Sequence, residues 1–482
     1  MRRDICHEPG QVLELIPDRQ QREHPCPGPK PQPWRIEPEP HTASQNRYHD
    51  PIEHLYWPLP AAGGTLEVLS LDVLLALLAT AVTAMLAFLA VRRLILLIAA
   101  WVTTTGLPAC DDADLPDVTL VVPAHNEATA SASLFRALER LDFPSERLSI
   151  MLLSDGSTDA TVQRFTSWTE RRKRCRTIVL QQQVGKARAL NEVLTKVDSE
   201  IAVVLDADLR PRPDFLRRVV TPFRDPSVGG VAGFILPDGA VKNLVTRYAA
   251  LESWLHQLVT SAGKDRLGLN PPTLGASAYR VEALRDVHFF PPVSQGEDVG
   301  ITIALTRAGW TTRFVADAVA ESSSVRTLGE YWRQHIRWSR GSFSAIAPPQ
   351  VDTAPVGRRP KERARLTPGR KLARRVETYA LSASYLDRVA LLAAVGLAAA
   401  DALPPWLPAA YLSLAGVEAY AALRIARARP LPYLAAAAVM FPIDASASVA
   451  AAALHAFRRP TRWHSPSRQP GTVAIEAEAS DR

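Results

Sequence analysis

The chain has 482 residues and a net charge of +7, so it is long enough for one or two folded domains with a full core. Its apolar residues gather near residues 66–90 and behind Tyr379, which excludes a wholly soluble protein and predicts a membrane protein with a soluble middle. The arginines cluster beside these apolar regions, so we interpret them as lipid-headgroup contacts and expect no nucleic-acid partner. None of the four cysteines has metal-ligand or redox spacing, which argues against a zinc or dithiol site.

The N-terminal region divides into a polar tail and an apolar segment. Residues 1–64 are proline-rich and polar without a helical or strand period, so we expect a disordered tail. Residues 65–107 hold the first transmembrane segment, because residues 66–90 are apolar enough to cross ~30 Å of hydrocarbon as a helix. Arg92 and Arg93 close this span, and the positive-inside trend then places the following domain in the cytoplasm. We therefore expect a multi-pass protein of the cytoplasmic membrane.

Between residues 115 and 345 the pattern alternates between strands and helices. Apolar runs of four or five residues are typical of strands covered on both faces, and each is followed by a helical pattern or a polar turn. The runs lie at residues 118–122, 149–153, 177–180 and 201–205. Strand–helix–strand connections of this length predict an α/β fold with a right-handed, mostly parallel sheet flanked by helices.

Polar side chains follow three of these strands at their carboxyl ends, where open α/β sheets bind ligands. The three are Glu127, Asp155 and Asp206. Asp208 lies two residues beyond Asp206, so both carboxylates point into one site if the strand geometry persists that far. Two carboxylates at ~4 Å repel by about 4 kcal/mol at an effective dielectric near 20, and Mg²⁺ or Mn²⁺ would relieve this repulsion. A strand that ends in a solvated acidic turn is the alternative interpretation.

Gly185 and Lys186 suggest a phosphate-binding loop, but the surrounding residues do not fit one. Ala187 stands where such a loop requires Ser or Thr, and Leu180 stands where it requires its first Gly. We therefore exclude a P-loop. No Gly-x-Gly-x-x-Gly motif follows a strand either, which disfavours a dinucleotide-binding fold.

Three further segments follow the acidic strand end, and the first is residues 275–280, which read Gly-Ala-Ser-Ala-Tyr-Arg and are a weak signal alone. Residues 296–298 read Gly-Glu-Asp, which alone would ordinarily be an acidic pair that counters a helix dipole. Residues 334–338 read Gln-His-Ile-Arg-Trp, which alone would ordinarily lie on an amphipathic helix. In this order along the chain, the motifs form one candidate site.

The combination resembles the membrane-embedded, inverting family-2 glycosyltransferases, the group that contains cellulose, chitin and hyaluronan synthases. The resemblance covers roughly residues 117–342 and rests on four motifs in register. They are Asp155, Asp206-Ala207-Asp208, Gly296-Glu297-Asp298 and Gln334-His335-Ile336-Arg337-Trp338. The fold that this resemblance implies is the GT-A type, a nucleotide-binding α/β sheet joined to an acceptor-binding half.

The resemblance assigns the nucleotide-sugar site to acidic and basic residues at the strand ends. Asp155 would hold the uracil or ribose, with Glu127 and Lys186 in the same pocket. Asp206 would contact the sugar nucleotide, and Asp208 would ligate the Mg²⁺ or Mn²⁺ that bridges the diphosphate. Such a cation stabilises the negative charge that builds on the leaving UDP.

The resemblance places catalysis and acceptor binding in the two later motifs. The Glu297 and Asp298 pair is the catalytic element, with Asp298 as the general base that deprotonates the acceptor hydroxyl. Arg337 would take the diphosphate with its planar guanidinium, Trp338 would stack on a terminal sugar, and Gln334 would hold the helix. With a reference pKa of ~3.9 an Asp is already ionised at neutral pH, so we expect the site to supply position and moderate basicity.

The function that the resemblance implies is a processive β-glycosyltransferase. It would polymerise a hexose or N-acetylhexosamine from a UDP-sugar and translocate the growing polysaccharide across the membrane, with possible accessory membrane or export subunits. A non-processive transferase that adds one or a few sugars to a lipid acceptor is one alternative. An inactive nucleotide-binding transporter or receptor is another.

The C-terminal part is expected to return to the membrane. We place a basic interfacial linker at residues 346–385, transmembrane helices at residues 386–458 and a disordered tail at residues 459–482. Three spans are candidates, and Asp444 inside the last could face a polymer channel or lie shielded between helices. Three spans here would put the basic residues after 457 outside, against the positive-inside trend, so either one span is re-entrant or the count is wrong.

Overall fold

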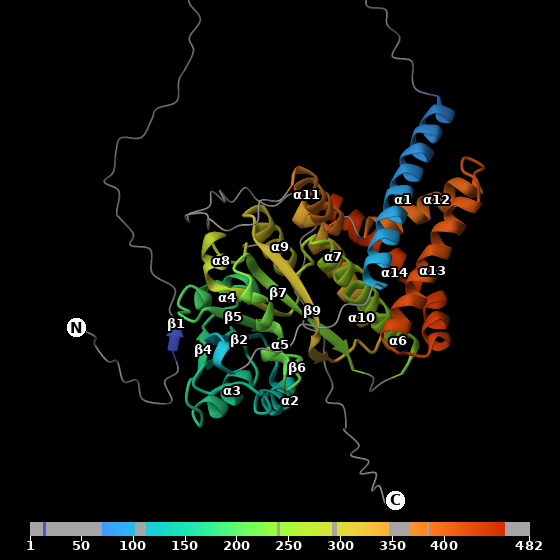
Figure 1. The fold of residues 1–482 in the computed structure, drawn as a ribbon. Helices are drawn as coiled ribbons and strands as arrows, with labels where there is room; N and C mark the ends of the chain where they lie inside the picture. Colours follow the sequence, from blue (N-terminus) through green and yellow to red (C-terminus); the bar gives the residue numbers. More distant parts are fainter. Residues whose placement is uncertain are drawn as a thin grey trace, which may run out of the picture. The chain divides into compact units, whose positions relative to one another are not determined.

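The computed structural model describes residues 13–15, 70–101, 112–238, 242–291, 296–346, 367–382 and 385–457 (Figure 1). The chain forms one unit of Met1–Ile16 with Leu75–Arg482 and a second of Pro17–Leu74, of which only residues 70–74 are described. The predicted C-terminal tail, nearly all of the N-terminal tail and much of the basic linker lie outside the described residues. Within the N-terminal tail, where we expected no secondary structure, Leu13–Leu15 form strand β1.

Nine strands in the described residues form one sheet, in the order β1-β4-β3-β2-β5-β8-β7-β9-β6. Their bounds are β1 Leu13–Leu15, β2 Val118–Ala124, β3 Leu148–Asp155, β4 Cys175–Leu180, β5 Ile201–Leu205, β6 Leu209–Pro211, β7 Val228–Pro237, β8 Ala276–Arg280 and β9 Thr311–Ser322. Strands β1, β4, β3, β2 and β5 run parallel, as do β7 and β9. Strand β8 is antiparallel to β5 and β7, and β6 is antiparallel to β9. The prediction of a mostly parallel α/β sheet is confirmed.

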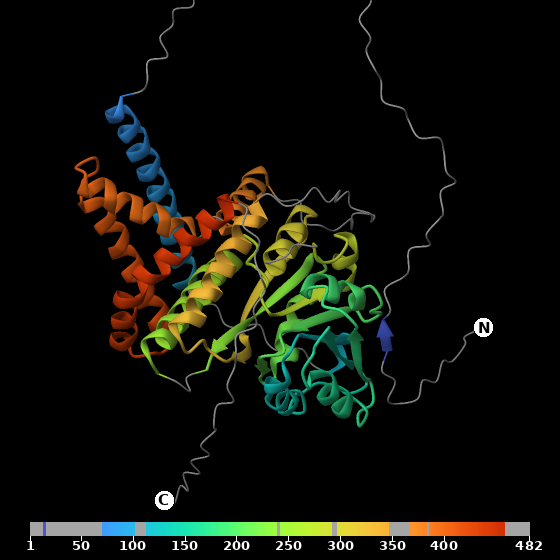
Figure 2. The ribbon, with the colours of Figure 1, turned by 180° about the vertical axis from the view of Figure 1, so that it is seen from behind.

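Helices cover the sheet and continue into a separate helical region (Figure 2). The helices that flank the sheet are α2 Ala128–Leu138, α3 Thr161–Thr169, α4 Lys186–Leu194, α5 Phe215–Val220, α8 Val281–Asp286 and α9 Glu297–Arg307. Those of the helical region are α1 Leu71–Trp101, α6 Leu244–Trp254, a π-helix at Leu255–Ser261, α7 Ala262–Leu267, α10 Leu328–Ile346, α11 Pro368–Ser382, α12 Leu386–Ala399, α13 Trp406–Ile425 and α14 Pro430–Ala456.

Strand β5 is buried on both faces because its side chains alternate between two apolar cores. Val203 and Leu205 join the core that α2, α3 and α5 cover. Ala202 and Val204 join the core that α4, α8 and α9 cover. All five residues of the strand are buried, as its unbroken apolar run predicts. The strand therefore delivers the following residues to a fixed place at the edge of the sheet.

Two helices of the described residues are long and apolar enough to cross a membrane, α1 with 31 residues and α14 with 27. Helix α12, the first of the three candidate C-terminal spans, has 14 residues and reaches about 21 Å at 1.5 Å per residue, which is shorter than ~30 Å of hydrocarbon. Helix α13 has 20 residues but does not match the other two in apolarity. Many large apolar side chains of α1 and α13 are exposed, among them Phe88, Ile98 and Trp406.

Helix α1 does not end at its two arginines, as the sequence led us to expect, but continues to Trp101. Arg92 forms an ion pair with Glu377 of α11 at 3.0 Å. Arg93 pairs with Glu418 of α13 at 2.6 Å and also with Asp387 of α12. The interpretation of these two arginines as headgroup contacts is therefore wrong, because their charges are met by carboxylates inside the protein.

Candidate active site

The chain turns immediately after β5, so Asp206 and Asp208 do not lie on a continued strand. The Asp206 N–H donates to the carbonyl of Gly275 at 2.8 Å, and the Leu209 N–H donates back to the Asp206 carbonyl at 2.9 Å. The expectation that strand geometry puts both carboxylates on one face is therefore not met. The two are nevertheless close: burial raises the pKa of Asp206, and the neighbouring Asp208 charge raises it further, against the lowering effect of Lys186.

The Asp206 carboxylate packs directly against Gly275. A Cβ at this position would lie 2.2 Å from the Asp206 Oδ2, which is far inside van der Waals contact. Only glycine leaves room for the carboxylate at this point, so the residue determines where Asp206 points. Sequence reasoning grouped the Gly275-Ala-Ser-Ala-Tyr-Arg segment with the candidate site but missed this role, because nothing in the local pattern marks what the glycine makes room for.

The Lys186 side chain forms ion pairs both with Asp206, just after β5, and with Glu297, at the start of α9. Its Nζ lies 2.8 Å from the Asp206 Oδ1 and 2.9 Å from the Glu297 Oε1. Burial opposes its charge, but the three carboxylates around it hold the pKa of Lys186 well above its usual range. An ammonium so placed is a permanent positive charge between two acidic motifs that are distant in the sequence.

Asp155 is the last residue of β3 and is buried. Its two carboxylate oxygens accept hydrogen bonds from the backbone N–H groups of Val184 and Gly185, at 2.7 and 2.9 Å. Gly185 has a φ of 92°, a conformation that a glycine adopts without strain. Asp155 therefore shapes the loop that presents Lys186, and its carboxylate still has acceptor capacity for a ligand.

Glu127 lies between β2 and α2, where the backbone is fixed by the start of α3. The Glu127 N–H donates to the Thr161 Oγ1 at 2.8 Å, and the Ala128 N–H donates to the Asp159 carboxylate at 3.1 Å. Burial alone would raise the pKa of Asp159, but hydrogen bonds from Thr161 and from Ala128 lower it. These bonds hold Glu127 at the same sheet edge as Asp155.

The acidic pair of the third motif begins helix α9, and its two carboxyl groups differ in environment. Gly296 precedes them with a φ of 78° and lies against the backbone of Gly341 in α10. Burial would raise the pKa of Glu297, but the Lys186 ammonium lowers it below its usual value. Burial raises the pKa of Asp298 to about 7; the Lys186 charge opposes this, and the Glu297 and Asp206 charges add to it.

Helix α10 carries the fourth motif to the same place. The positive charge of Arg337 is one of the causes that lower the pKa values of Glu297 and Asp298, so its guanidinium lies near the start of α9. Trp338 is 44% exposed, and Gln334 is one turn before it on the same helical face. An exposed indole offers a flat apolar face on which a sugar ring can stack.

Charged residues from four separate segments thus meet at the carboxyl ends of the parallel strands. They are Lys186, Asp206, Asp208, Glu297, Asp298 and Arg337, with Asp155 holding the adjoining loop. Carboxylate oxygens are the ligands that Mg²⁺ and Mn²⁺ prefer, and the mutual repulsion of Asp206 and Asp208 fits a cation between them.

Comparison with known proteins adds three findings. Residues 116–341 match a family model described as "Glycosyltransferase like family 2". An N-acetylglucosaminyltransferase of Rhizobium meliloti (strain 1021) is 30% identical over 241 residues, which cover 48% of this chain and 56% of that protein. The probable glycosyltransferase YdaM of Bacillus subtilis (strain 168) is 26% identical over 234 residues, with the same shares covered. The chain therefore spans a little over half the length of these relatives.

One solved structure is similar over a larger part of the chain. The mannosyltransferase PcManGT from Pyrobaculum calidifontis, in complex with GDP-Man and Mn²⁺, aligns with a TM-score of 0.54 and 25% sequence identity. The alignment covers 80% of this chain and all of that one. This alignment covers more of the chain than the family model does, so the structural similarity extends beyond residues 116–341.

Proposed function

We propose that the family-2 glycosyltransferase domain of this protein transfers a sugar from a UDP-sugar to a carbohydrate acceptor, with inversion at the anomeric carbon. Support comes from residues 116–341, which match the family model, and from similar proteins that are named as glycosyltransferases. The observation that carries the proposed chemistry is the contact of Lys186 with Asp206 and Glu297 beside Asp298.

The donor would bind along the strand ends. Asp155 would receive the uracil or ribose, with Glu127 and Lys186 beside it. Asp206 would contact the sugar nucleotide and Asp208 would ligate one Mg²⁺ or Mn²⁺; PcManGT, which was solved with Mn²⁺, supports a cation of this kind. When bound, such a cation neutralises charge on the leaving diphosphate.

The two acidic residues of α9 would have different roles, because their pKa values are shifted in opposite directions. Glu297 stays ionised and neutralises Lys186. Asp298, with a pKa of about 7, is matched to proton transfer near neutral pH. As the acceptor oxygen attacks the anomeric carbon, its proton passes to the Asp298 carboxylate. The bond from that carbon to the UDP oxygen breaks, and its electron pair leaves with UDP.

The acceptor side would be formed by α10. Arg337 would contact the diphosphate, Trp338 would stack on the terminal sugar and Gln334 would hold the helix in place. We propose a processive polymerisation of a hexose or N-acetylhexosamine, followed by translocation through the helices. Two arguments support this proposal: the Gln-x-x-Arg-Trp motif, and the packing of α10 on the apolar helix α14. The name of the Rhizobium meliloti relative supports N-acetylglucosamine as the donor sugar.

The membrane location is also part of the proposal. Helices α1 and α14 have the length and apolarity of spans, and α1 exposes large apolar side chains along most of its length. Contiguous exposed apolar surface of this kind fits lipid rather than water. We propose the cytoplasmic membrane, with the catalytic domain in the cytoplasm where nucleotide sugars occur.

The non-processive alternative rests on one specific observation. Asp444, which we expected either to face a channel or to lie shielded between helices, is fully buried and bound by Tyr248 and Arg388. A carboxylate held in this way does not line an open path for a polymer. One or a few transfers to a lipid acceptor would need no such path.

The test is a screen for UDP release by the purified full chain with UDP-N-acetylglucosamine, UDP-glucose and UDP-glucuronate, with GDP-mannose as the competing donor. We expect release from one UDP-sugar, and mass spectrometry of the product then gives its length. Products with only one or two added sugars would refute processive polymerisation. Turnover of GDP-mannose alone would refute the UDP-sugar assignment, and no turnover of any donor would refute the function.

A further inference from the structure

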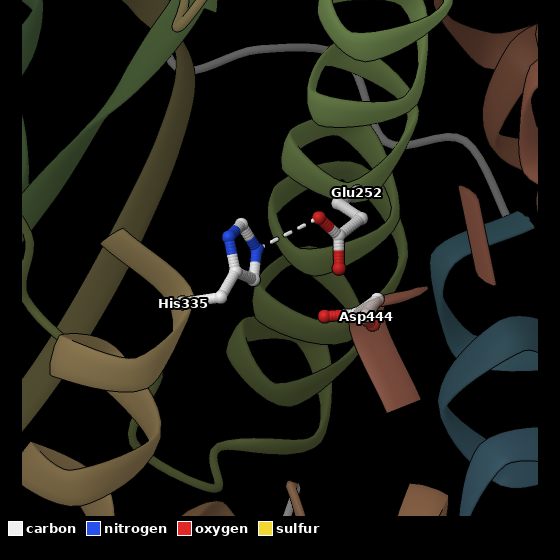
Figure 3. A group of neighbouring side chains, drawn as sticks. All are labelled: Glu252, His335 and Asp444. Atoms are coloured by element: carbon white, nitrogen blue, oxygen red, sulfur yellow. Dashed lines mark ion pairs between the residues drawn. The ribbon is translucent and has the colours of Figure 1, made fainter. Parts of the chain in front are cut away.

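A second polar cluster lies on helix α10, on the side that faces the helical region (Figure 3). It is formed by Glu252 of α6, His335 of α10, Arg388 of α12 and Asp444 of α14. His335 is 2% exposed and Asp444 is fully buried. None of the four has a role in the proposed reaction, yet His335 stands inside the Gln-x-x-Arg-Trp motif.

His335 is held at both ring nitrogens by acceptors. Its Nε2 lies 2.9 Å from the Glu252 Oε2, as Figure 3 shows, and its Nδ1 lies 3.0 Å from the Tyr331 carbonyl oxygen. Two acceptors require both nitrogens to donate, which only the imidazolium does. Burial lowers the pKa of His335, but the Glu252 carboxylate more than compensates and raises it overall. The pKa of Glu252 falls correspondingly to about 2.

Arg388 connects the remaining members of the cluster. Its Nη2 lies 2.9 Å from the Glu252 Oε1, and its Nε contacts the Asp444 Oδ2. Tyr248 donates a further hydrogen bond to Asp444 at 3.2 Å. Four elements that are distant in the sequence, α6, α10, α12 and α14, therefore meet through one set of ion pairs.

The spacing of the cluster also suits a metal ion, since one ligand atom each of Glu252, His335 and Asp444 lies within 4.8 Å of the others. Two observations exclude this interpretation. Both carboxylates already contact the Arg388 guanidinium, and the His335 Nε2 donates to Glu252 instead of offering a lone pair. The two positive side chains fill the position that a cation would take.

From these contacts we infer that Glu252, His335, Arg388 and Asp444 position helix α10, so that the place of Arg337 and Trp338 depends on helices α12 and α14. The inference rests on the proposed function for the role of Trp338 as an acceptor platform. In α-helical geometry Arg337 points about 200° around the axis from His335, so the cluster and the catalytic charges hold opposite sides of one helix.

Two contacts couple the position of α10 to the candidate active site. The His335 and Trp338 rings meet in an edge contact with their centroids 5.1 Å apart, so the imidazole limits the orientations that the indole can take. Farther along α10, Gly341 lies against Gly296, the residue that precedes the catalytic pair. A rotation or slide of α10 would therefore change the distance between Trp338 and Asp298.

The test uses the full chain in detergent with four variants: His335→Gln, Glu252→Gln, the double variant and His455→Ala. His455 is a matched control, because it also joins α14 to α10, through an edge contact with Phe343, but it is exposed and outside the cluster. UDP binding in the presence of Mn²⁺ measures the donor side. Donor turnover and product length measure the acceptor side, and hydrogen exchange of the α10 amides measures the position of the helix.

For His335→Gln we expect UDP binding within about twofold of the parent, while sugar transfer falls about 10- to 100-fold, as a displacement of ~1 Å at a site produces. Exchange in α10 should rise while that in α4 stays unchanged. The double variant should lose less transfer than the product of the two single effects, because both changes break the His335–Glu252 pair. His455→Ala should match the parent in every measurement.

Three results would overturn the inference. The first is wild-type transfer and product length in His335→Gln, and the second is unchanged exchange in α10. The third is loss of UDP binding together with transfer, which would make the cluster a general stabiliser of the fold. Wild-type protein that releases no UDP from any donor would refute the proposed function alone, and the exchange of α10 would still decide the role of the cluster.

Discussion

Replacing Glu297 with Gln should move the pH dependence of sugar transfer to lower pH. The Asp298 carboxyl group, with a pKa of about 7, must be ionised to accept the acceptor proton, so activity is present above this pH and is lost as pH falls through it. The Glu297 charge is one of the causes that raise this pKa, and the Lys186 charge lowers it. Removing Glu297 takes away a negative neighbour and frees Lys186, and both changes lower the pKa of Asp298.

For the parent protein, the size of the change in kcat/KM with pH follows from the titration of Asp298. With a pKa of about 7, roughly one-tenth of Asp298 is ionised at pH 6 and roughly nine-tenths at pH 8, so kcat/KM should rise about tenfold between them. In Glu297→Gln the inflection should lie below that of the parent, with a smaller rise over the same range. Loss of the base itself in Asp298→Asn should reduce the rate by ~10²–10⁴.

The assay is initial-rate UDP release at limiting donor across the pH range in which the protein stays folded. Glu192→Gln is the matched control, because Glu192 lies on the exposed face of α4, the helix that begins with Lys186. This variant should keep the inflection of the parent. An inflection in Glu297→Gln that stays in place or moves upward would refute the assignment of Asp298 as the titrating base.

Three further predictions follow from the same site. Gly275→Ala should lower transfer by about 10²-fold, since its Cβ would lie 2.2 Å from the Asp206 Oδ2; Gly416→Ala, where nothing lies within 4 Å, should leave UDP release unchanged. Chelation should abolish transfer and added Mn²⁺ should restore it, whereas Asp208→Asn should need a higher Mn²⁺ concentration for half-maximal UDP release. Trp338→Ala should shorten the product seen by mass spectrometry while UDP binding, measured by calorimetry, stays within about twofold.

The strands and the strand-end carboxylates could be predicted because their signals are local. The run at residues 201–205 is apolar at every position, and every position is buried between two cores. The acidic pair at 297 and 298 could be interpreted as the start of a helix or as part of a site, and it is the first turn of α9 within the charged cluster. The local sequence pattern was therefore sufficient to predict these strands and helices, and to predict the sheet edge at which the acidic residues lie.

The ion pairs that organise the molecule could not be predicted, because they join residues that are distant in the chain. Arg92 pairs with a glutamate 285 residues away, and no pattern near either residue marks the partnership. Two adjacent arginines after an apolar run are typical of a membrane boundary. Because neighbours on a helix point about 100° apart, Arg92 and Arg93 instead reach different helices of the C-terminal region.

The candidate active site and the cluster behind α10 differ in a way that separates a ligand site from a structural one. The candidate active site gathers four carboxyl groups around two positive side chains. The carboxyl groups are Asp206, Asp208, Glu297 and Asp298, and the positive groups are Lys186 and Arg337.

The cluster behind α10 instead sets its carboxylates against a guanidinium and an imidazolium. A diphosphate brings further negative charge to a site that already has an excess of it, so binding is unfavourable unless a cation accompanies the donor. A cluster whose carboxylates are already paired with positive side chains has no such requirement. Chelation should therefore abolish sugar transfer and leave the hydrogen exchange of α10 unchanged, whereas His335→Gln should alter that exchange whether or not a metal is present.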